Sequence, residues 1–460
     1  MTHTRFTTTA MLKAAVRGDI IAPGDPAYDS ARTIWNAMID RRPAVIVRCA
    51  ADDDVPVAIG FARENGLEIS VRGGGHNIAG NAVCDGGLMI DLSAMKDVRV
   101  DPATRRAFVK SGATLRDVDA ATQAHALAVP VGINSTTGIA GLTLGGGFGW
   151  LTRKHGLTID NLASADIVTA DGKAHHLSPQ ENGDLFWAIR GGGGNFGVIT
   201  RFEFALHPVG QDVHAGLIVF PFDRAAQVLR QYREFVKSAP EELNVWVLVR
   251  QAPPLPFLPA AVHGQPIVAL AVLHAGPAAD GERAVAPLRR FAAPLGEHVA
   301  SVPYVAWQQA FDPLLTPGAR NYWKSHNFTE LSDGVLDSIV EFGRRLPLPQ
   351  CEIFIGLVGG AANRVAPDAT AYRHRDARFV MNVHGRWETA AEDDEGIDWA
   401  RAFFRASAPY ASAGAYVNFM TAEETERVAA AYGANYDRLV DIKRRYDPDN
   451  VFHMNQNIAP

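Results

Sequence analysis

The amino-acid sequence predicts an α+β protein with two domains, in which a second domain with an antiparallel sheet and flanking helices follows a glycine-rich first domain. At 460 residues, the chain exceeds the size at which a single hydrophobic core usually stops growing. Glycine clusters occur in the first part of the chain, whereas from about Pro208 apolar strand-like segments alternate with amphipathic ones. We therefore expect domains at residues 1–207 and 208–415, and a C-terminal segment, 416–460, that returns to the first domain.

The composition is that of a globular protein, with 47% apolar and 20% charged residues. The 44 Lys and Arg residues against 50 Asp and Glu give a net charge of −6, and no basic block favours nucleic acid. No apolar run approaches the ~20 residues of a membrane span, and the first residues lack the apolar region of a signal peptide. Cys49, Cys84 and Cys351 are odd in number and show no paired spacing, as in reducing compartments. We expect a cytoplasmic protein that binds neither nucleic acid nor membrane.

The first elements predict a β-α-β unit that ends in a glycine loop. We expect a helix over 29–39, a strand over 44–50 and a helix over 53–66, the last with acidic cap candidates and a glycine stop. The next strand leads into the sequence VRGGGHNIAG at 71–80. Its three consecutive glycines allow positive φ angles and let backbone N–H groups approach an anionic ligand. His76 presents an imidazole at the same place.

The rest of the first domain predicts short strands around a second glycine-rich loop. Strands are expected at 88–95 and 106–112, and a helix at 114–125. Residues 130–149 are too rich in Gly, Ser and Thr for a core element, so they predict a loop around a polar ligand. A hairpin with an Asp-Gly turn is expected at 162–178.

The third glycine-rich stretch, RGGGGNFG at 190–197, formally matches the dinucleotide-binding pattern G-x-G-x-x-G at Gly192, Gly194 and Gly197. In a Rossmann fold that pattern must open a helix. The residues that follow, VITRFEFAL, are β-branched and aromatic and predict a strand. The Rossmann interpretation is therefore excluded, and the three glycine stretches predict that several backbone segments converge on one large ligand.

The second domain predicts strands separated by helices at 225–239 and 334–346. The expected strands lie at 216–222, 243–252, 267–276, 351–361 and 379–388. In the last of these, alternation places Asn382, His384 and Arg386 on one face. Such a polar face is either exposed to solvent or lines a substrate cavity. The C-terminal tail predicts a charged helix followed by a turn.

Five motifs, in order over nearly the whole chain, resemble the bacterial type of berberine-bridge-enzyme-like FAD-linked oxidases, of the vanillyl-alcohol-oxidase superfamily. They are VRGGGHNIAG, GIAGLTLGGGFGWLTRKHGLTIDNL at 138–162, GGGGNFGVIT, YVNF at 416–419, and YDPDNVFHMNQNI near the end. The resemblance implies a PCMH-type FAD-binding fold, FAD as cofactor and a small-molecule substrate. The cofactor-binding residues implied are Arg72, Gly73, Gly74, Gly75, His76, Asn77, Gly80, Val131, Gly132, Thr136, Thr137, Gly138, Gly141, Gly145, Gly146, Gly149, Val198, Ile199, Asn418, Asn455 and Asn457.

Three positions in the glycine-rich loops carry particular expectations. His76 matches the histidine that bonds covalently to the 8α-methyl of the flavin in the family; the alternative is a loop histidine that only makes a hydrogen bond. Relatives with a doubly linked flavin carry a cysteine where this chain has Asn134, so the resemblance implies a single link. Thr137 falls where a small β-branched residue leaves room for dioxygen, which favours an oxidase over a dehydrogenase.

The resemblance also implies catalytic residues. Tyr416 of the Y-x-N motif matches the base of several members, although a strand tyrosine packed at the domain interface would look the same. The family places substrate-facing strands at 379–388, which favours the cavity for Asn382 and His384 and makes His384 a candidate partner of Tyr416. An aromatic wall or ordinary core packing would explain Tyr322, Trp323 and Tyr372.

Three functions remain open from the sequence. The first is a flavoenzyme that oxidises an alcohol, a sugar or a secondary metabolite and passes the electrons to dioxygen. The second is a flavin dehydrogenase of the same fold with another acceptor. The third is a flavin-containing binding or sequestration protein. No metal-binding pattern occurs, so we expect no metal.

Overall fold

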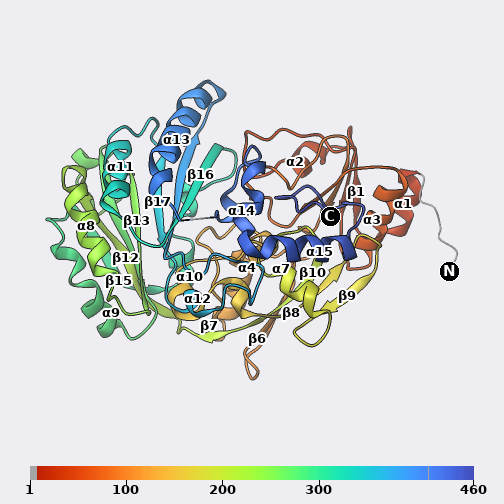
Figure 1. Ribbon diagram of the computed structural model, residues 1–460, viewed down its shortest axis with the longest axis horizontal. Helices are drawn as coiled ribbons and strands as arrows, with labels where there is room; N and C mark the ends of the chain where they lie inside the picture. Colours follow the sequence, from red (N-terminus) through yellow and green to blue (C-terminus); the bar gives the residue numbers. More distant parts are fainter. Residues whose placement is uncertain (1–7, 413) are drawn as a thin grey trace.

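The computed structural model describes residues 8–412 and 414–460, so residues 1–7 and 413 of the expected domains lie outside the description. It confirms the α+β class. Figure 1 shows two parts side by side: a large sheet with its helices, in green to light blue, and a second part that combines red, orange and yellow segments with the dark-blue C-terminal helix α15. The polypeptide therefore runs from one part to the other and back.

The large sheet is antiparallel throughout, as the sequence predicted for the second domain. Its strand order is β15-β12-β14-β13-β17-β18-β16. The strands are β12 (Asp212–Pro221), β13 (Leu243–Gln251), β14 (Pro266–His274), β15 (Gly296–Pro303), β16 (Arg320–Phe328), β17 (Glu352–Leu357) and β18 (Phe379–Trp387). The five predicted strands correspond to β12, β13, β14, β17 and β18, whereas β15 and β16 had not been predicted.

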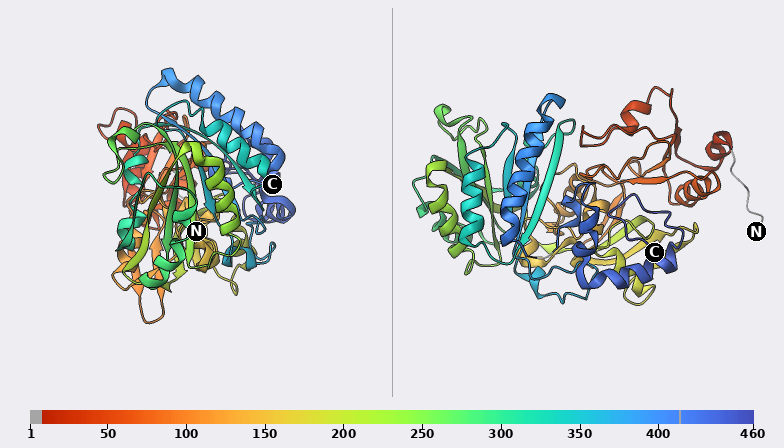
Figure 2. Two further views of the ribbon diagram at one scale, coloured as in Figure 1. Left: turned by 90° about the vertical axis from the view of Figure 1, so that its left-hand side faces the viewer. Right: turned by 45° about the horizontal axis from the view of Figure 1, so that its top comes forward.

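Helices cover one face of this sheet. The helices α8 (Ala225–Phe235), α11 (Asp333–Gly343) and α13 (Asp393–Ser407) lie next to one another, and Figure 2 shows them over the outer face. A Cβ atom on Gly385 of β18 would lie 3.6 Å from the carbonyl of Gly396 in α13. Because side chains alternate along a strand, Asn382, His384 and Arg386 face the other way, toward the glycine-rich part. Shorter helices are α9 (Ala278–Val285), α10 (Tyr304–Gln308) and α12 (Ala361–Arg364).

The glycine-rich part contains two principal sheets. The first has the order β1-β2-β4-β3, formed by β1 (Asp19–Ile21), β2 (Val45–Arg48), β4 (Leu88–Asp91) and β3 (Ile69–Arg72). Both β2 and β3 are parallel to β4, and α3 (Asp54–Glu64) connects them, which confirms the β-α-β unit. The second has the order β5-β6-β10-β8-β9, formed by β5 (Val98–Asp101), β6 (Arg106–Lys110), β10 (Val198–Ala205), β8 (Leu162–Val168) and β9 (Ala174–Leu177).

Strand β10 follows the third glycine stretch directly, which confirms that this stretch does not open a helix. The hairpin β8–β9 is also confirmed. The remaining elements are α1 (Thr9–Ala15), α4 (Leu115–Gln123), β7 (Leu127–Ala128), α6 (Thr152–His155), α7 (Gly183–Ile189) and β11 (His207–Pro208). Strand β5 was missed by the sequence analysis.

The helix predicted over 29–39 is wrong beyond its first turn. The structure has only α2 (Tyr28–Arg32), and the following residues exchange helical hydrogen bonds for long-range ones. The backbone N–H of Trp35 donates to the carbonyl of Gly75, and that of Ala37 donates to Ala319. These tertiary contacts override a local helical propensity.

The segment 130–149 is not entirely a loop, as had been predicted, because α5 (Ile139–Leu144) interrupts it. Ile139, Ala140 and Thr143 are buried. The packing of these side chains stabilises a short helix that its glycine content concealed.

The C-terminal segment packs on the glycine-rich part. In α15 (Tyr436–Tyr446), Lys443 donates a hydrogen bond to the carbonyl of Asn195 at 2.7 Å, and the backbone N–H of Ile458 donates to the Asn195 side chain at 3.0 Å. The short helix α14 (Val428–Tyr432) precedes α15. The domain boundaries at 207 and 415 remain predictions. Within the described part of the chain, every helix is too short or too polar to cross a membrane.

Candidate active site

Two adjoining cavities lie along the glycine loops. The first, of about 240 Å³, is bounded by the loops on one side and by the large sheet on the other. The second, of about 130 Å³, lies between the loops and the C-terminal segment. Gly73, Asn77, Gly141 and Asn418 line both, so the cavities form one elongated space. Its size and its two arms are suited to an extended ligand.

Close backbone packing explains part of the glycine loop. A Cβ atom on Gly74 would lie 2.2 Å from the backbone nitrogen of Gly138, so the first and second glycine stretches touch here without side chains. Gly75 has a φ of +72°, whereas Gly73 and Gly74 do not adopt positive φ. The interpretation that all three glycines serve positive φ angles is therefore corrected: Gly74 is required by its contact with Gly138.

Most of the cofactor-binding residues implied by the resemblance line the cavities. They are Gly73, Gly74, Gly75, His76, Asn77, Gly132, Thr137, Gly138, Gly141, Val198, Ile199, Asn418 and Asn455. The sequence analysis did not assign Gly193, Gly194, Gly197, Tyr432 and Gln456, which line the second cavity. The third glycine motif could have identified the three glycines, since it had already been recognised as a ligand-binding stretch.

The other implied residues, Arg72, Gly80, Val131, Thr136, Gly145, Gly146, Gly149 and Asn457, lie outside the cavity lining. Arg72 forms a buried ion pair with Asp91 at 2.6 Å and a hydrogen bond with the carbonyl of Ala31 at 2.6 Å. A Cβ atom on Gly80, whose φ is +78°, would lie 2.8 Å from Ile39. Their assignment to the cofactor stays a prediction, and in this structure Arg72 and Gly80 contact residues behind the loop.

The second glycine stretch likewise serves packing at several positions. A Cβ atom on Gly149 would lie 1.7 Å from the carbonyl oxygen of Val131, so the close backbone contact between these two residues requires glycine. A Cβ atom on Gly145 would clash with the side chain of Asn418, and one on Gly146 with that of Tyr372. These glycines therefore allow the C-terminal segment and the 372 loop to approach the cavity.

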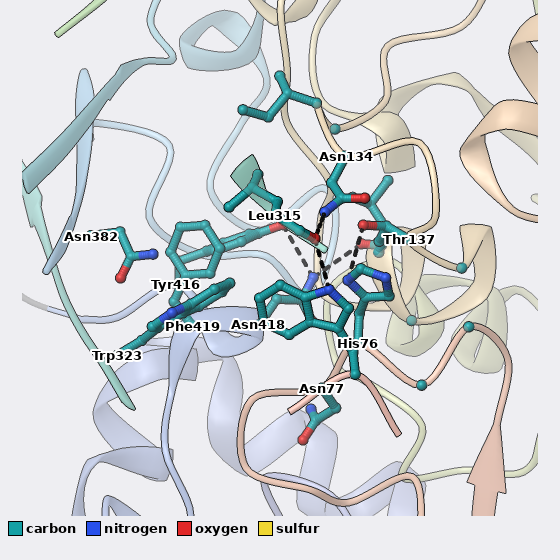
Figure 3. Close-up of a pocket in the computed structure, with 18 of the residues that line it drawn as sticks. His76, Asn77, Asn134, Thr137, Leu315, Trp323, Asn382, Tyr416, Asn418 and Phe419 are labelled. Carbon is teal, nitrogen blue, oxygen red and sulfur yellow. Dashed lines mark hydrogen bonds between the residues drawn. The ribbon is translucent and has the colours of Figure 1, made fainter. Parts of the chain in front are cut away.

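His76 is partly buried at the cavity edge and is neutral. Burial lowers the pKa of its imidazole to about 3. The ring stacks on Trp35, with the centroids 5.0 Å apart and the planes inclined by 21°. Its Nε2 lies 2.8 Å from the hydroxyl of Thr136, and its Nδ1 lies 3.4 Å from that of Thr137. Figure 3 shows His76 between Asn134, Thr137 and Asn77.

Opposite the loops, four side chains form a row across adjacent strands. The register pairs Arg250 of β13 with Glu352 of β17, Glu352 with His384 of β18, and His384 with Trp323 of β16. Arg250 contacts Glu352 at 2.9 Å, and Glu352 contacts Nδ1 of His384 at 3.1 Å. Glu352, His384 and Trp323 line the cavity, and the row connects it to a buried charge pair.

The pKa values in this row follow from burial and charge. Burial alone would raise the pKa of Glu352, but Arg250 and His384 lower it to about 2. Burial lowers the pKa of His384, while Glu352 opposes that effect. Since the ionised carboxylate accepts from Nδ1, Nε2 of His384 carries the lone pair, and it has no hydrogen-bond partner among the described residues. His384 is thus arranged as a neutral proton acceptor.

Tyr416 is arranged as a donor. Its hydroxyl oxygen accepts hydrogen bonds from the backbone N–H of Gly147 at 3.2 Å and from the side-chain amide of Asn418 at 3.1 Å. Burial raises its pKa, although the two bonds oppose that effect. Tyr416 and His384 are each hydrogen-bonded to other groups in the described chain, and their partnership stays a prediction.

The cavity wall is largely aromatic. Its aromatic side chains are Trp35, Phe148, Trp246, Trp323, Phe354, Tyr416 and Phe419, and Figure 3 shows Trp323, Tyr416 and Phe419 close together beside Asn382. Of the three aromatic residues considered from sequence, only Trp323 lines this cavity. Tyr322 instead bonds to Glu423 and Arg401, and Tyr372 packs on Gly191. Trp35 and Glu352 carried no local sequence signal.

The comparisons with known proteins define the class. Residues 43–178 match the family described as "FAD binding domain", and residues 415–459 match the family described as "Berberine and berberine like". The chain belongs to the berberine-bridge-enzyme-like FAD-linked oxidoreductases; it is a flavoenzyme with FAD as its cofactor.

Individual relatives cover almost the whole chain. It is 32% identical to an uncharacterised FAD-linked oxidoreductase, YgaK, of Bacillus subtilis, over 98% of both chains. It is 32% identical to (R)-6-hydroxynicotine oxidase of Paenarthrobacter nicotinovorans, over 97% of both. The crystal structure of 6-hydroxy-D-nicotine oxidase of Arthrobacter nicotinovorans superposes with a TM-score of 0.86 at 30% identity, over 97% of this chain and 98% of that one.

The cavity residues fit FAD. Neither cavity is lined by a lysine or arginine of the described chain, so glycine backbone and the amides of Asn77, Asn418 and Asn455 would meet the phosphates and ribose. The apolar first cavity would hold the ring system beside His76. Among the described residues, no group of three His, Cys, Asp or Glu side chains could hold a metal ion.

Proposed function

We propose that this protein is an oxidase that carries FAD on His76 through one covalent bond and oxidises a small, ring-containing alcohol or amine. The observation that carries the proposal is the position of His384, which lines a cavity that His76 closes on the other side and whose buried Nε2 has no hydrogen-bond partner among the described residues. Bound FAD supplies an acceptor for hydride. The polypeptide must then supply a group that takes the proton of the substrate hydroxyl or amine.

His384 is that group in our proposal. The Nδ1–H bond to Glu352 fixes the tautomer, and the carboxylate offsets the charge that the imidazole gains with a proton. Asn382 lies next to it on the same face of β18 and orients the substrate through its amide. Nε2 of His384 is buried in this structure. The Trp323 ring packs edge-on to the imidazole with the ring centroids 4.6 Å apart, so we propose that substrate binding moves this indole aside.

Tyr416 acts as a hydrogen-bond donor rather than as the base. Both lone pairs of its oxygen are used by Gly147 and Asn418, so its own proton is available to a substrate oxygen or nitrogen. The raised pKa keeps this proton in place. Tyr416 and His384 thus offer one donor and one acceptor to the same ligand.

The aromatic wall supports a flat apolar substrate over an oligosaccharide. Flat rings stack on such surfaces, whereas a sugar requires several hydrogen-bonding side chains. Glu352, the only carboxylate among the described residues that line the first cavity, is already balanced by Arg250. We therefore place the substrate among heteroaromatic or aromatic alcohols and amines, the chemistry named for the hydroxynicotine oxidase relative.

Dioxygen is the proposed electron acceptor. Thr137 lines the cavity next to His76, and its small side chain leaves space on that side. A cytoplasmic location is part of the proposal, supported by the buried free thiols of Cys49, Cys84 and Cys351. Cell fractionation would test the location.

The test is anaerobic mixing with panels of aromatic alcohols, cyclic amines and sugars, followed by admission of air. We expect an aromatic alcohol or amine to bleach the flavin absorbance, and air to restore it within seconds with formation of hydrogen peroxide. Bleaching only by sugars would contradict the substrate class. Recovery over many minutes would show a dehydrogenase, and a spectral shift without bleaching would show a binding protein.

A further inference from the structure

A chain of hydrogen bonds runs behind His76 and ends on a backbone carbonyl. The side-chain amide of Asn134 donates to the carbonyl of Leu315 at 3.2 Å. Its oxygen accepts from the hydroxyl of Thr136 at 2.7 Å and from the Thr136 backbone N–H at 3.1 Å. The Thr136 hydroxyl lies 2.8 Å from Nε2 of His76. Figure 3 shows Asn134 between Leu315 and this histidine.

The protons in this chain can be placed one by one. The carbonyl of Leu315 accepts only, so the Asn134 NH₂ group faces it and the Asn134 oxygen faces Thr136. Thr136 has one hydroxyl proton, and the bond to Asn134 uses it. The Thr136 oxygen can therefore only accept from His76. Nε2 of His76 carries the ring proton, and Nδ1 carries the lone pair.

The orientation of the ring is fixed as well. Trp35, which stacks on His76, donates its indole N–H to the same Leu315 carbonyl at 3.0 Å. The backbone N–H of Ser135 donates to the carboxylate of Asp312 at 2.9 Å, and Asp312 lies on the same segment as Leu315. The loop with Thr136 and the stacking indole are thus anchored on one segment, 312–315. Nδ1 meets only the hydroxyl of Thr137, at 3.4 Å, which can donate to it.

We propose that Asn134 and Thr136 are positioning residues that hold His76 as its Nε2–H tautomer, so that Nδ1 is the nitrogen that forms the bond to FAD. The inference rests on the covalent link in the proposed function and deepens it. The C–N bond forms as a C–H bond of the 8α-methyl breaks. One proton leaves the methyl and one leaves Nε2, and the two electrons pass to dioxygen, which is reduced to hydrogen peroxide. Neutral Nδ1 is required because a protonated nitrogen has no lone pair.

The rate at which FAD becomes covalently attached tests the role of the Asn134–Thr136–His76 hydrogen-bond chain. Full-length protein produced without flavin is mixed with FAD in air, and the flavin retained by acid-precipitated chain is followed with time. We expect Thr136→Val to attach FAD about tenfold more slowly, the factor that corresponds to one neutral hydrogen bond. Thr136→Ser restores the hydroxyl and should restore the rate. Thr104→Val is the matched control, because it makes the same substitution at an exposed residue of the turn between β5 and β6.

The ¹⁵N chemical shifts of His76 provide a readout that a purely structural role would not change. In the flavin-free protein we expect a protonated Nε2 and an unprotonated Nδ1, and Thr136→Val and Asn134→Leu should shift the population toward the other tautomer. A wild-type protein with the proton on Nδ1, or wild-type attachment rates in Thr136→Val, would contradict the proposed role of Asn134 and Thr136. Wild-type protein that never retains flavin would refute the covalent link, whereas the shifts would still decide the tautomer.

Discussion

The two walls of the cavity each present a neutral histidine, His76 partly buried and His384 buried, and the two are held in opposite tautomers. His76 on the loop wall is bonded through Nε2 to a neutral hydroxyl, whereas His384 on the sheet wall is bonded through Nδ1 to the ionised Glu352. If His76 gained a proton, no charged side chain among residues 8–412 and 414–460 would be hydrogen-bonded to it, and desolvation lowers its pKa to about 3. If His384 gained a proton, Glu352 would offset it. One environment makes a nucleophile, and the other makes a proton acceptor.

Replacing the loop-wall histidine should have the largest effect. In His76→Ala no nitrogen remains that could bond to FAD, so we expect covalent flavin to fall from nearly full occupancy to none. Fluorescence of the denatured chain on a gel measures this. His384→Gln is the control, since a residue on the sheet wall should leave attachment intact. Covalent flavin in His76→Ala would place the link on another residue.

Replacing the sheet-wall histidine should affect catalysis instead. We expect His384→Gln to slow flavin reduction by substrate about 10²- to 10⁴-fold, the usual contribution of a general base. Reoxidation by dioxygen should not change, and stopped-flow absorbance separates the two steps. Tyr416→Phe removes one hydrogen bond and should slow reduction only about tenfold. If Tyr416→Phe proved the more damaging of the two, the base would be Tyr416.

The pH dependence of kcat/KM tests the role of Glu352, the carboxylate that accepts a hydrogen bond from His384. As a base, His384 must be neutral, and burial lowers its pKa, so kcat/KM should stay level through pH 6.5 and fall only at more acidic pH. Glu352 raises that pKa, so Glu352→Gln should move the acidic limb to still lower pH. It should also lower the plateau about 10- to 100-fold, because one charge-assisted hydrogen bond is lost.

A pH series of kcat/KM for both proteins measures these changes. The exposed Glu388, which follows the same strand, provides the matched control in Glu388→Gln, where the profile should not move. A limb that moved to higher pH in Glu352→Gln would contradict the assignment of Glu352 as the group that stabilises the protonated imidazole.

The two walls also differed in how far the sequence predicted them. Glycine loops, His76 and the strand after GGGGNFG were predictable, because short motifs determine them locally. The row from Arg250 to Trp323 was not, since strand register brings together side chains that are far apart in sequence. From the sequence, Asn134 was noted only because it replaces the cysteine of relatives with a doubly linked flavin. Its hydrogen bonds to Leu315 and Thr136 could not be predicted, because they depend on the fold.

Arg72 shows the opposite case: it adjoins the glycine loop in sequence, yet its side chain bonds to Asp91 and to the carbonyl of Ala31 and does not line either cavity. It donates to Asp91, whose side chain is fully buried and also binds Arg48. The loop wall is therefore neutral where it faces the cavity and charged behind it, whereas on the sheet wall the ionised Glu352 itself lines the cavity. Arg72→Met should have little effect on the site and a large effect on the fold.

We expect Arg72→Met to destabilise the protein by about 3 kcal/mol, at the lower end for a broken buried pair because Arg48 remains on Asp91. The folded fraction should still attach FAD fully. Denaturant unfolding and retained flavin on the same samples measure the two effects. Arg42→Met is the control: the side chain is 64% exposed and lies 3.9 Å from Asp40, so its change should stay within about 0.5 kcal/mol. A well-folded Arg72→Met protein that retained no flavin would show that Arg72 contributes directly to FAD binding.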